Sequence, residues 1–295
     1  MTNITDKLIA KIDEMNNPTV AGLDPRIDFL PDELKKTATT FEGCAKAVTE
    51  FNCRIIDSIK DIVPAVKIQS AFYELYSHYG TLAMDETAKY AKESGLIVMA
   101  DVKRNDIGPT AEAYAAAYLG GELYDYITVN PYPGYDGIKP FADVCAKNGK
   151  GIFVLARMSN PSAADIQNMK LESGEPLYMH IGGLIEQWGS QLVGENGYSA
   201  VGAVVGATNP DEARFLRKKL PSVFFLVPGY GAQGGKGKDA AASFDEKGKG
   251  AIVNNSRGII AAYKTDKYKG MTYYAAAREA ATAMAEDLYS ALKNK

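Results

Sequence analysis

The chain has 295 residues, of which 46% are hydrophobic and 23% charged, a balance typical of a water-soluble globular protein with a substantial core. Its formal net charge of −3 argues against general binding to nucleic acids or acidic membranes. The N-terminal segment lacks the apolar stretch of a secretory signal, and no apolar run approaches the roughly 18 residues of a membrane span. We therefore expect a cytoplasmic protein without membrane or nucleic-acid partners.

Short apolar runs rich in β-branched residues recur along the chain and predict its strands. We expect these strands at residues 18–24, 64–69, 95–103, 126–132, 151–158, 200–208, 222–229 and 251–256. Segments with helical spacing lie between most of them, such as 41–59 and 211–220. Apolar strands that alternate with helices indicate a parallel sheet covered by helices, and eight such units fit a (β/α)8 TIM barrel. Because no linker divides the chain, we predict a single barrel domain over residues 1–295.

The longest interruption of this pattern is residues 159–199, which follow the fifth predicted strand. Its first part is rich in polar and turn residues, whereas 175–192 has the spacing of a helix. A long insertion after a barrel strand often forms a lid over the site. We predict a lid insertion here, and surface decoration is the alternative.

Charged residues gather where the second and third predicted strands end, and barrel enzymes carry their chemistry at that end. Lys67 lies inside an apolar strand, and a buried lysine needs a charged partner. Side chains alternate along a strand, so Asp101 and Lys103 point to the same face, and Asp106 follows in the next turn. We predict one alternating network of these four residues, with a structural salt-bridge network as the alternative.

The carboxylates that flank Lys103 in the sequence indicate which chemistry its side chain performs. Nearby negative charge favours the ammonium form over the neutral amine. An amine nucleophile needs the neutral form, so this role is disfavoured. The pattern instead favours a cation that stabilises developing negative charge and then donates a proton.

A glycine-rich segment follows the seventh predicted strand. Residues 229–234 match the spacing of a dinucleotide fingerprint, but that fingerprint belongs in the first βα turn of a different fold. Barrels commonly bind phosphate with the loops after strands seven and eight, and arginine presents a planar fork to phosphate oxygens. We therefore predict a phosphate site formed by Gln233, Arg257 and Gly258.

The residues that most often bind metals are scattered. The three cysteines and two histidines are Cys44, Cys53, Cys145, His78 and His180. They lack the spacing of a metal cluster, so we expect no metal site and free thiols in a reducing compartment.

The combination of Asp101-x-Lys103-x-x-Asp106 with Lys67 one strand earlier resembles the orotidine 5′-phosphate decarboxylase family. The resemblance covers almost the whole chain, and the long connection after the fifth strand is similar to the longer bacterial-type subgroup. It implies decarboxylation of orotidine 5′-monophosphate to uridine 5′-monophosphate and CO2, the last step of de novo UMP synthesis. It also implies that the reaction needs no metal or organic cofactor.

The same resemblance implies roles for individual positions. The implied catalytic network is Lys67, Asp101, Lys103 and Asp106. The implied substrate contacts are Asp24 and Lys67 to ribose hydroxyls, Ser159 to the pyrimidine, and Gln233 and Arg257 with Gly258 to phosphate. Asp106 and Thr110 would reach the ribose bound in the neighbouring subunit, which implies a homodimer with shared active sites.

Three other functions stay open at this point. One is a metal-dependent enzyme of the same barrel superfamily that acts on sugar phosphates, in which the two aspartates would help to bind Mg2+. Another is a Schiff-base aldolase with Lys103 as nucleophile. The third is a non-catalytic protein that binds a phosphosugar.

Overall fold

The computed structural model describes residues 2–231 and 234–295, and these residues form a closed barrel of eight parallel strands. The strands are β1 Thr19–Leu23, β2 Ala65–Gln69, β3 Ile97–Arg104, β4 Tyr126–Val129, β5 Gly151–Arg157, β6 Val201–Val205, β7 Phe225–Val227 and β8 Ala251–Asn255. Strands pair in chain order, and β8 closes the barrel on β1. The predicted (β/α)8 barrel is confirmed.

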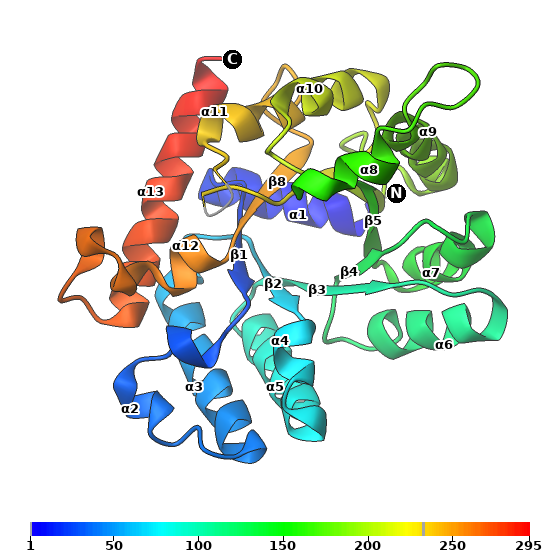
Figure 1. Ribbon diagram of the computed structural model, residues 1–295. Coiled ribbons are helices and arrows are strands. Elements are labelled where there is room, and N and C mark those ends of the chain that lie inside the picture. Colours follow the sequence, from blue (N-terminus) through cyan, green and yellow to red (C-terminus); the bar gives the residue numbers. More distant parts are fainter. Residues whose placement is uncertain (1, 232–233) are drawn as a thin grey trace.

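Helices surround the strands, as Figure 1 shows. They are α1 Ile4–Met15, α2 Asp32–Lys35, α3 Phe41–Ile59, α4 Ala71–Glu74, α5 Ser77–Glu93, α6 Gly108–Leu119, α7 Tyr135–Asn148, α8 Ala164–Gln167, α9 Leu177–Gly189, α10 Pro210–Lys219, α11 Gly237–Ala240, α12 Arg257–Ile260 and α13 Tyr273–Lys293. The predicted helix over 41–59 coincides with α3, which begins after Thr40 because the Thr40 hydroxyl accepts a hydrogen bond from the Gly43 amide. No helix in the described part of the chain is long and apolar enough to cross a bilayer.

Three strands end two or three residues earlier than the sequence predicts. β7 ends directly before Pro228, and β4 ends two residues before Pro131. Proline has no amide hydrogen to offer a neighbouring strand. β6 ends at Val205, next to Gly206. These shorter strands leave more backbone in the loops at the C-terminal end of the barrel.

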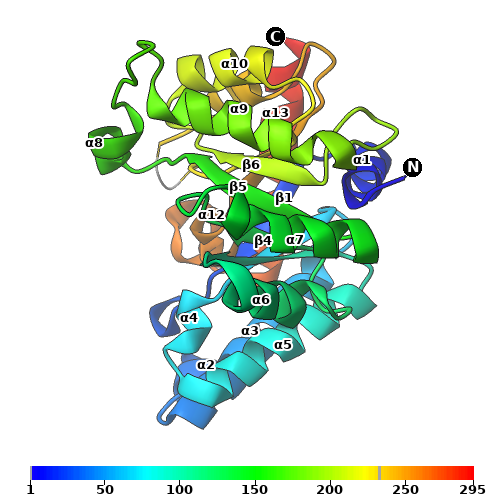
Figure 2. The ribbon, with the colours of Figure 1, turned by 90° about the vertical axis from the view of Figure 1, so that its right-hand side faces the viewer.

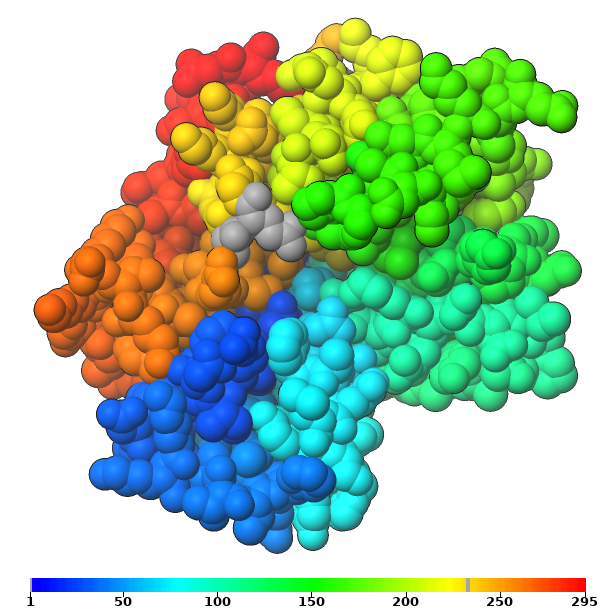
Figure 3. Space-filling view, viewed as in Figure 1, coloured from blue at the N-terminus to red at the C-terminus, as the bar shows by residue number. Residues whose placement is uncertain are grey.

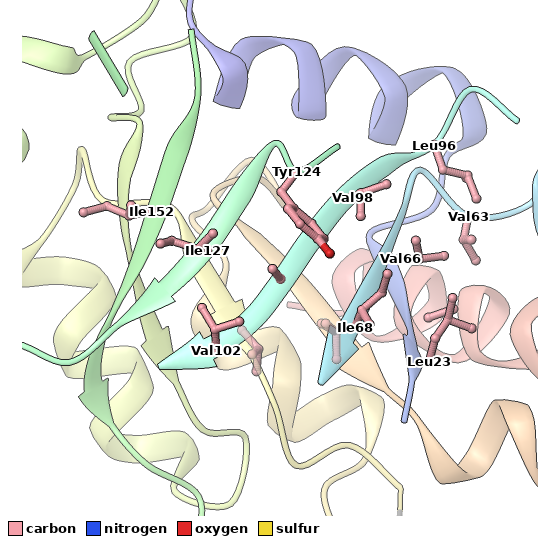
Figure 4. Close-up of a cluster of buried hydrophobic side chains, with 14 of the residues drawn as sticks. Leu23, Val63, Val66, Ile68, Leu96, Val98, Val102, Tyr124, Ile127 and Ile152 are labelled. Carbon is pink, nitrogen blue, oxygen red and sulfur yellow. The ribbon is translucent and has the colours of Figure 1, made fainter. Parts of the chain in front are cut away.

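Each strand divides its side chains between the surrounding helices and the barrel interior. Figure 4 shows part of the outward set, including Leu23, Val66, Ile68, Val98 and Ile127. The inward set at the N-terminal end of the barrel is also apolar and consists of Val20, Ala65, Ile97, Met99, Tyr126, Phe153, Leu226 and Ile252. Helix α1 closes this end with side chains of the same cluster. In Figure 2, α1 lies at one end of the barrel and α4 and α8 lie at the other.

The inward positions change from apolar to polar along the same strands. Two residues beyond the apolar layer, the inward side chains are those of Lys67 on β2, Asp101 on β3, Thr128 on β4 and Asn254 on β8. The apolar layer stabilises the barrel, since full burial of one such side chain contributes about 1.5–3 kcal/mol. The polar layer at the C-terminal end therefore lies on a rigid support.

The predicted lid insertion contains two different parts. Helix α9 packs on β5 and β6, and its Gly182 approaches Leu220 so closely that an added Cβ would lie 2.8 Å from the leucine side chain. Leu220 directly follows α10, so α9 packs between the strands and the end of α10 and is the covering helix of the fifth βα unit. Residues 159–176 precede it and contain α8 and a short antiparallel bridge between Lys170 and Pro176.

Candidate active site

A cavity of about 420 Å3 opens at the C-terminal end of the barrel. Four of the residues predicted for the site line it: Asp24, Lys67, Asp101 and Arg257. Figure 3 shows this face as a hollow bordered by segments from both ends and the middle of the chain. These four residues thus converge although they come from four different βα units.

Asp101 is held by hydrogen bonds on both of its carboxylate oxygens. Its carboxylate accepts four hydrogen bonds from described residues. Oδ2 accepts from Lys67 Nζ at 3.0 Å and Gln69 Nε2 at 2.9 Å. Oδ1 accepts from Lys103 Nζ at 2.5 Å and from the Thr128 hydroxyl at 2.9 Å. A carboxylate offers about four lone-pair sites, so every acceptor position of Asp101 is used.

The charges of Asp101 and Lys67 stabilise each other. Burial disfavours the ionised form of Asp101, but the ammonium groups of Lys67 and Lys103 outweigh burial and hold its pKa well below the usual value. Burial likewise disfavours the ammonium form of Lys67, and the carboxylates of Asp101 and Asp24 outweigh it and raise the pKa of Lys67. The site therefore holds a buried ion pair that stays charged at neutral pH.

Lys103 occupies a conformation that is rare for residues other than glycine. Its φ is +44°, in the left-handed region, and the β3–β4 pairing shifts register between Ala100 and Arg104. Its side chain is 37% exposed, in contrast to 5% for that of Lys67. The Lys103 ammonium is thus partly exposed and contacts Asp101, although Lys103 is not among the described residues that line the cavity.

Two acceptor oxygens in residues that line the cavity have no hydrogen-bond partner among the described residues. Asp24 Oδ1 lies 3.7 Å from Lys67 Nζ and accepts no hydrogen bond, and neither does Asn254 Oδ1. Buried acceptors without a donor are costly in a folded protein. An unpaired oxygen at a cavity is therefore typical of a group that accepts a hydrogen bond from a hydroxyl of a ligand.

Asp106 and Thr110 lie outside this ion-pair network within one chain. The Asp106 carboxylate accepts a hydrogen bond from the Ile107 amide, and no ion pair among the described residues includes it. Thr110 is exposed in the first turn of α6, and Ile107 beside it is 58% exposed. The charged contacts therefore run through Asp24, Lys67, Asp101 and Lys103, with Asp106 on the adjacent surface.

Ser159 follows β5, and its backbone contacts the segment that follows β6. The Thr208 hydroxyl donates to the Ser159 carbonyl at 3.0 Å. Gly206 lies so close that an added Cβ would be 2.8 Å from Ser159 Cα. The preceding amide, that of Met158, donates to Gln167 Oε1 at 3.0 Å. These contacts place Ser159 at the C-terminal rim, although it is not among the described residues that line the cavity.

The structure describes Arg257 and Gly258 of the predicted phosphate site and the glycines of the loop after β7. Gly229, Gly231 and Gly234 have φ values of +100°, +70° and +96°, which explains why this loop needs glycine. Arg257 lines the cavity, and the Gly258 amide donates to Asn255 Oδ1 at 3.1 Å. Gln233 lies outside the described residues.

The structure adds three polar residues that the sequence analysis did not select. Gln69 and Thr128 both bond Asp101, and Asn254 presents an unpaired oxygen to the cavity. Gln69 is two residues after Lys67, so strand alternation alone predicts that it shares the inward face. Thr128 and Asn254 also lie within predicted strands, but a single threonine or asparagine there has no distinctive sequence signal.

The arrangement favours electrostatic chemistry with anions. Two ammonium groups lie within 3.0 Å of the Asp101 oxygens, and both would repel a metal cation at that carboxylate. Within residues 2–231 and 234–295, no three His, Cys, Asp or Glu side chains are grouped so that they could hold a metal ion. The site can bind an anionic ligand and place a proton donor beside it.

Comparisons with known proteins agree with this geometry. Residues 20–269 match the model of the family described as "Orotidine 5'-phosphate decarboxylase / HUMPS family". The orotidine 5′-phosphate decarboxylase of Caldicellulosiruptor bescii is 42% identical over 279 residues, which cover 90% of this chain and 91% of that protein. The protein of the same name from Clostridium kluyveri is 38% identical and covers 99% of both chains. The solved OMP decarboxylase of Leishmania donovani has a TM-score of 0.78 at 28% identity, covering 99% of this chain and 100% of its own.

Proposed function

The chain belongs to the orotidine 5′-phosphate decarboxylase / HUMPS family, and from this premise we propose that it converts orotidine 5′-monophosphate (OMP) to uridine 5′-monophosphate (UMP) and CO2. It is a carboxy-lyase of pyrimidine biosynthesis that works in the cytoplasm. The observation that carries the proposal is the contact between Lys103 Nζ and Asp101 Oδ1, 2.5 Å apart at the mouth of the barrel. That contact places a proton donor and a fixed negative charge side by side.

The proposed reaction uses both charges. The bond between C6 of the pyrimidine and the carboxylate carbon breaks, and its electron pair stays on C6, where no adjacent group can delocalise it. The Lys103 ammonium stabilises this pair and then transfers a proton to C6. Lys103 is partly exposed, so water can return the proton. Asp101 would lie against the substrate carboxylate, where like charge disfavours the ground state.

The remaining groups of the cavity suit a ribose phosphate. Asp24 Oδ1 needs a hydrogen-bond donor, which a ribose hydroxyl supplies, and Lys67 lies beside it. Arg257 and Gly258, with Gln233, would bind the phosphate, and Ser159 would contact the pyrimidine. Binding energy from the distant phosphate can then organise the reacting end of the site. Residues 159–176, which precede α9, would close over the substrate as a lid.

We further propose a homodimer in which Asp106 and Thr110 complete the partner's site. Both residues lie on one surface segment next to the exposed Ile107, and Asp106 makes no ion pair within its own described chain. Two inactive variants test this sharing: Lys103→Ala and Asp106→Asn. If sites are shared, mixed dimers contain one site with neither substitution and regain activity. A mixture that stays inactive after subunit exchange contradicts the shared site.

The proposed reaction needs no metal or organic cofactor, because ammonium groups supply the positive charge. A metal-dependent sugar-phosphate enzyme would place its cation at Asp101, beside two ammonium groups. A Schiff-base enzyme would have to deprotonate a lysine that contacts a carboxylate at 2.5 Å. The geometry favours neither of these two enzymes. A protein that only binds a phosphosugar would not need the contact between Lys103 and Asp101.

The deciding experiment incubates chelator-treated protein with OMP and follows the pyrimidine absorbance. We expect complete conversion to UMP at a rate that added Mg2+ does not change. Correctly folded protein that binds UMP but does not convert OMP would refute the assignment and favour the non-catalytic alternative. Borohydride trapping with substrate should leave the enzyme unmodified.

A further inference from the structure

The hydroxyl of Thr128 joins the backbone of Lys103 to the carboxylate of Asp101. The Lys103 amide donates to Thr128 Oγ1 at 2.9 Å, and Thr128 Oγ1 donates to Asp101 Oδ1 at 2.9 Å. Thr128 is 3% exposed and points into the barrel from β4. It is the inward residue of β4 directly above the apolar layer.

The direction of both hydrogen bonds is fixed by chemistry. A backbone amide can only donate, and an ionised carboxylate can only accept. The single hydrogen of the Thr128 hydroxyl must therefore point at Asp101, while its lone pair faces the Lys103 amide. A β-branched side chain also has little rotational freedom at χ1, so the hydroxyl stays in place.

These bonds complete a closed ring of contacts. The ring runs from the Lys103 amide to Thr128 Oγ1, to Asp101 Oδ1, and back to Lys103 Nζ. Lys103 is thus held at both its backbone and its ammonium end. The ring lies where β3 and β4 lose register, between Ala100 and Arg104, so regular strand pairing does not hold this part of β3.

We propose that Thr128 is a positioning residue that keeps Lys103 in its left-handed conformation and its ammonium on Asp101. A positive φ in a residue other than glycine persists only where the surroundings impose it. Without the hydroxyl, the Lys103 amide and one lone pair of Asp101 lose their partner. Lys103 then relaxes toward ordinary strand geometry, and its ammonium moves away from the reacting carbon. This inference rests on the proposed decarboxylation for its kinetic consequence, but its structural consequence is independent of any activity.

Three variants test the inference. Thr128→Val keeps the shape and removes the hydroxyl, and Thr128→Ser keeps the hydroxyl. The control is Thr19→Val, because the Thr19 hydroxyl is buried on β1 and has no hydrogen-bond partner in the described chain. We expect Thr128→Val to lower kcat for OMP about 10- to 100-fold, the effect of losing hydrogen bonds that involve a charged group. KM should change less than about twofold because Thr128 does not line the described cavity.

Thr128→Ser should recover kcat to within about threefold of the starting protein, and Thr19→Val should match it. An unchanged kcat in Thr128→Val, or no recovery in Thr128→Ser, overturns the inference. Crystal structures of the ligand-free variants give a second measurement that does not need turnover. In Thr128→Val, Lys103 should leave the positive-φ region or its Nζ should move beyond about 3.5 Å from Asp101 Oδ1. An unchanged Lys103 geometry overturns the inference even if the protein proves inactive toward OMP, whereas OMP inactivity alone refutes only the proposed function.

Discussion

Replacing Lys67 with methionine should destabilise the protein in a way that depends on pH. The Lys67 side chain is 5% exposed, and its Nζ lies 3.0 Å from Asp101 and 3.7 Å from Asp24. Methionine keeps the apolar volume but leaves both carboxylates without their shared cation. Removing one partner of a buried ion pair costs about 3–5 kcal/mol. We expect a loss of this size in the free energy of unfolding at pH 7.

The pH dependence follows from the depressed pKa of Asp101. Its folded-state pKa lies below the unfolded value of about 3.9, so its ionisation stabilises the protein above about pH 4, and this contribution is lost as the pH falls through the folded pKa. In Lys67→Met the pKa of Asp101 rises, so the variant lacks part of that contribution. The difference between the two proteins should be largest above about pH 5 and smaller near pH 3.5.

Urea unfolding followed by circular dichroism at several pH values measures this difference. The matched control is Lys60→Met, since the Lys60–Asp57 pair is 2.8 Å long but about half exposed, and exposed pairs contribute only about 0–1 kcal/mol. A loss below about 1 kcal/mol at pH 7 would show that the buried pair does not hold the site together. A large loss that is the same at pH 3.5 and pH 7 would assign the effect to packing instead of charge.

Three further substitutions test individual parts of the site. Lys103→Ala should still bind UMP but lose turnover about 1,000-fold or more, and near-normal OMP conversion would remove Lys103 from its proposed role. Arg257→Ala should weaken UMP affinity about 10- to 100-fold in a binding titration, so unchanged affinity would contradict the phosphate contact. Gly206→Ala places a Cβ 2.8 Å from Ser159 Cα and should lower kcat/KM about tenfold or more. Gly183→Ala is its control, because no atom lies within 4 Å of the added Cβ; equal activities of these two variants would show that Ser159 can move without cost.

The sequence predicts the core of the candidate site because strand alternation is a local rule. Asp101 and Lys103 are two residues apart, so their shared face follows from the geometry of any strand, and the same rule places Lys67 in the barrel. The structure shows Lys67 in the cavity and Lys103 in contact with Asp101, although Lys103 makes this contact with a positive φ, outside regular strand geometry. The eight apolar runs likewise predict the barrel, since parallel strands covered by helices must be apolar on both faces.

Other features depend on contacts between segments that are distant in the chain. The register shift opposite Thr128 and the positive φ of Lys103 arise from the pairing of β3 with β4, which no local pattern reports. Within residues 159–199, only the packing of α9 on β5 and β6 shows that α9 belongs to the barrel. Helical spacing alone does not distinguish a barrel helix from part of a lid. Asp106 lies outside the ion-pair network of its own described chain for a similar reason, since sequence proximity to Lys103 does not fix the direction of the turn between them.

The four donors around Asp101 limit what this carboxylate can do. An acid–base group must exchange its proton during each cycle, and a group that recognises a ligand must have a lone pair to offer. Asp101 can do neither. Two ammonium groups stabilise its ionised form, and four hydrogen-bond donors use all the lone pairs of its two oxygens. Its contribution to any reaction in the cavity is therefore a stationary negative potential that stays the same from one turnover to the next.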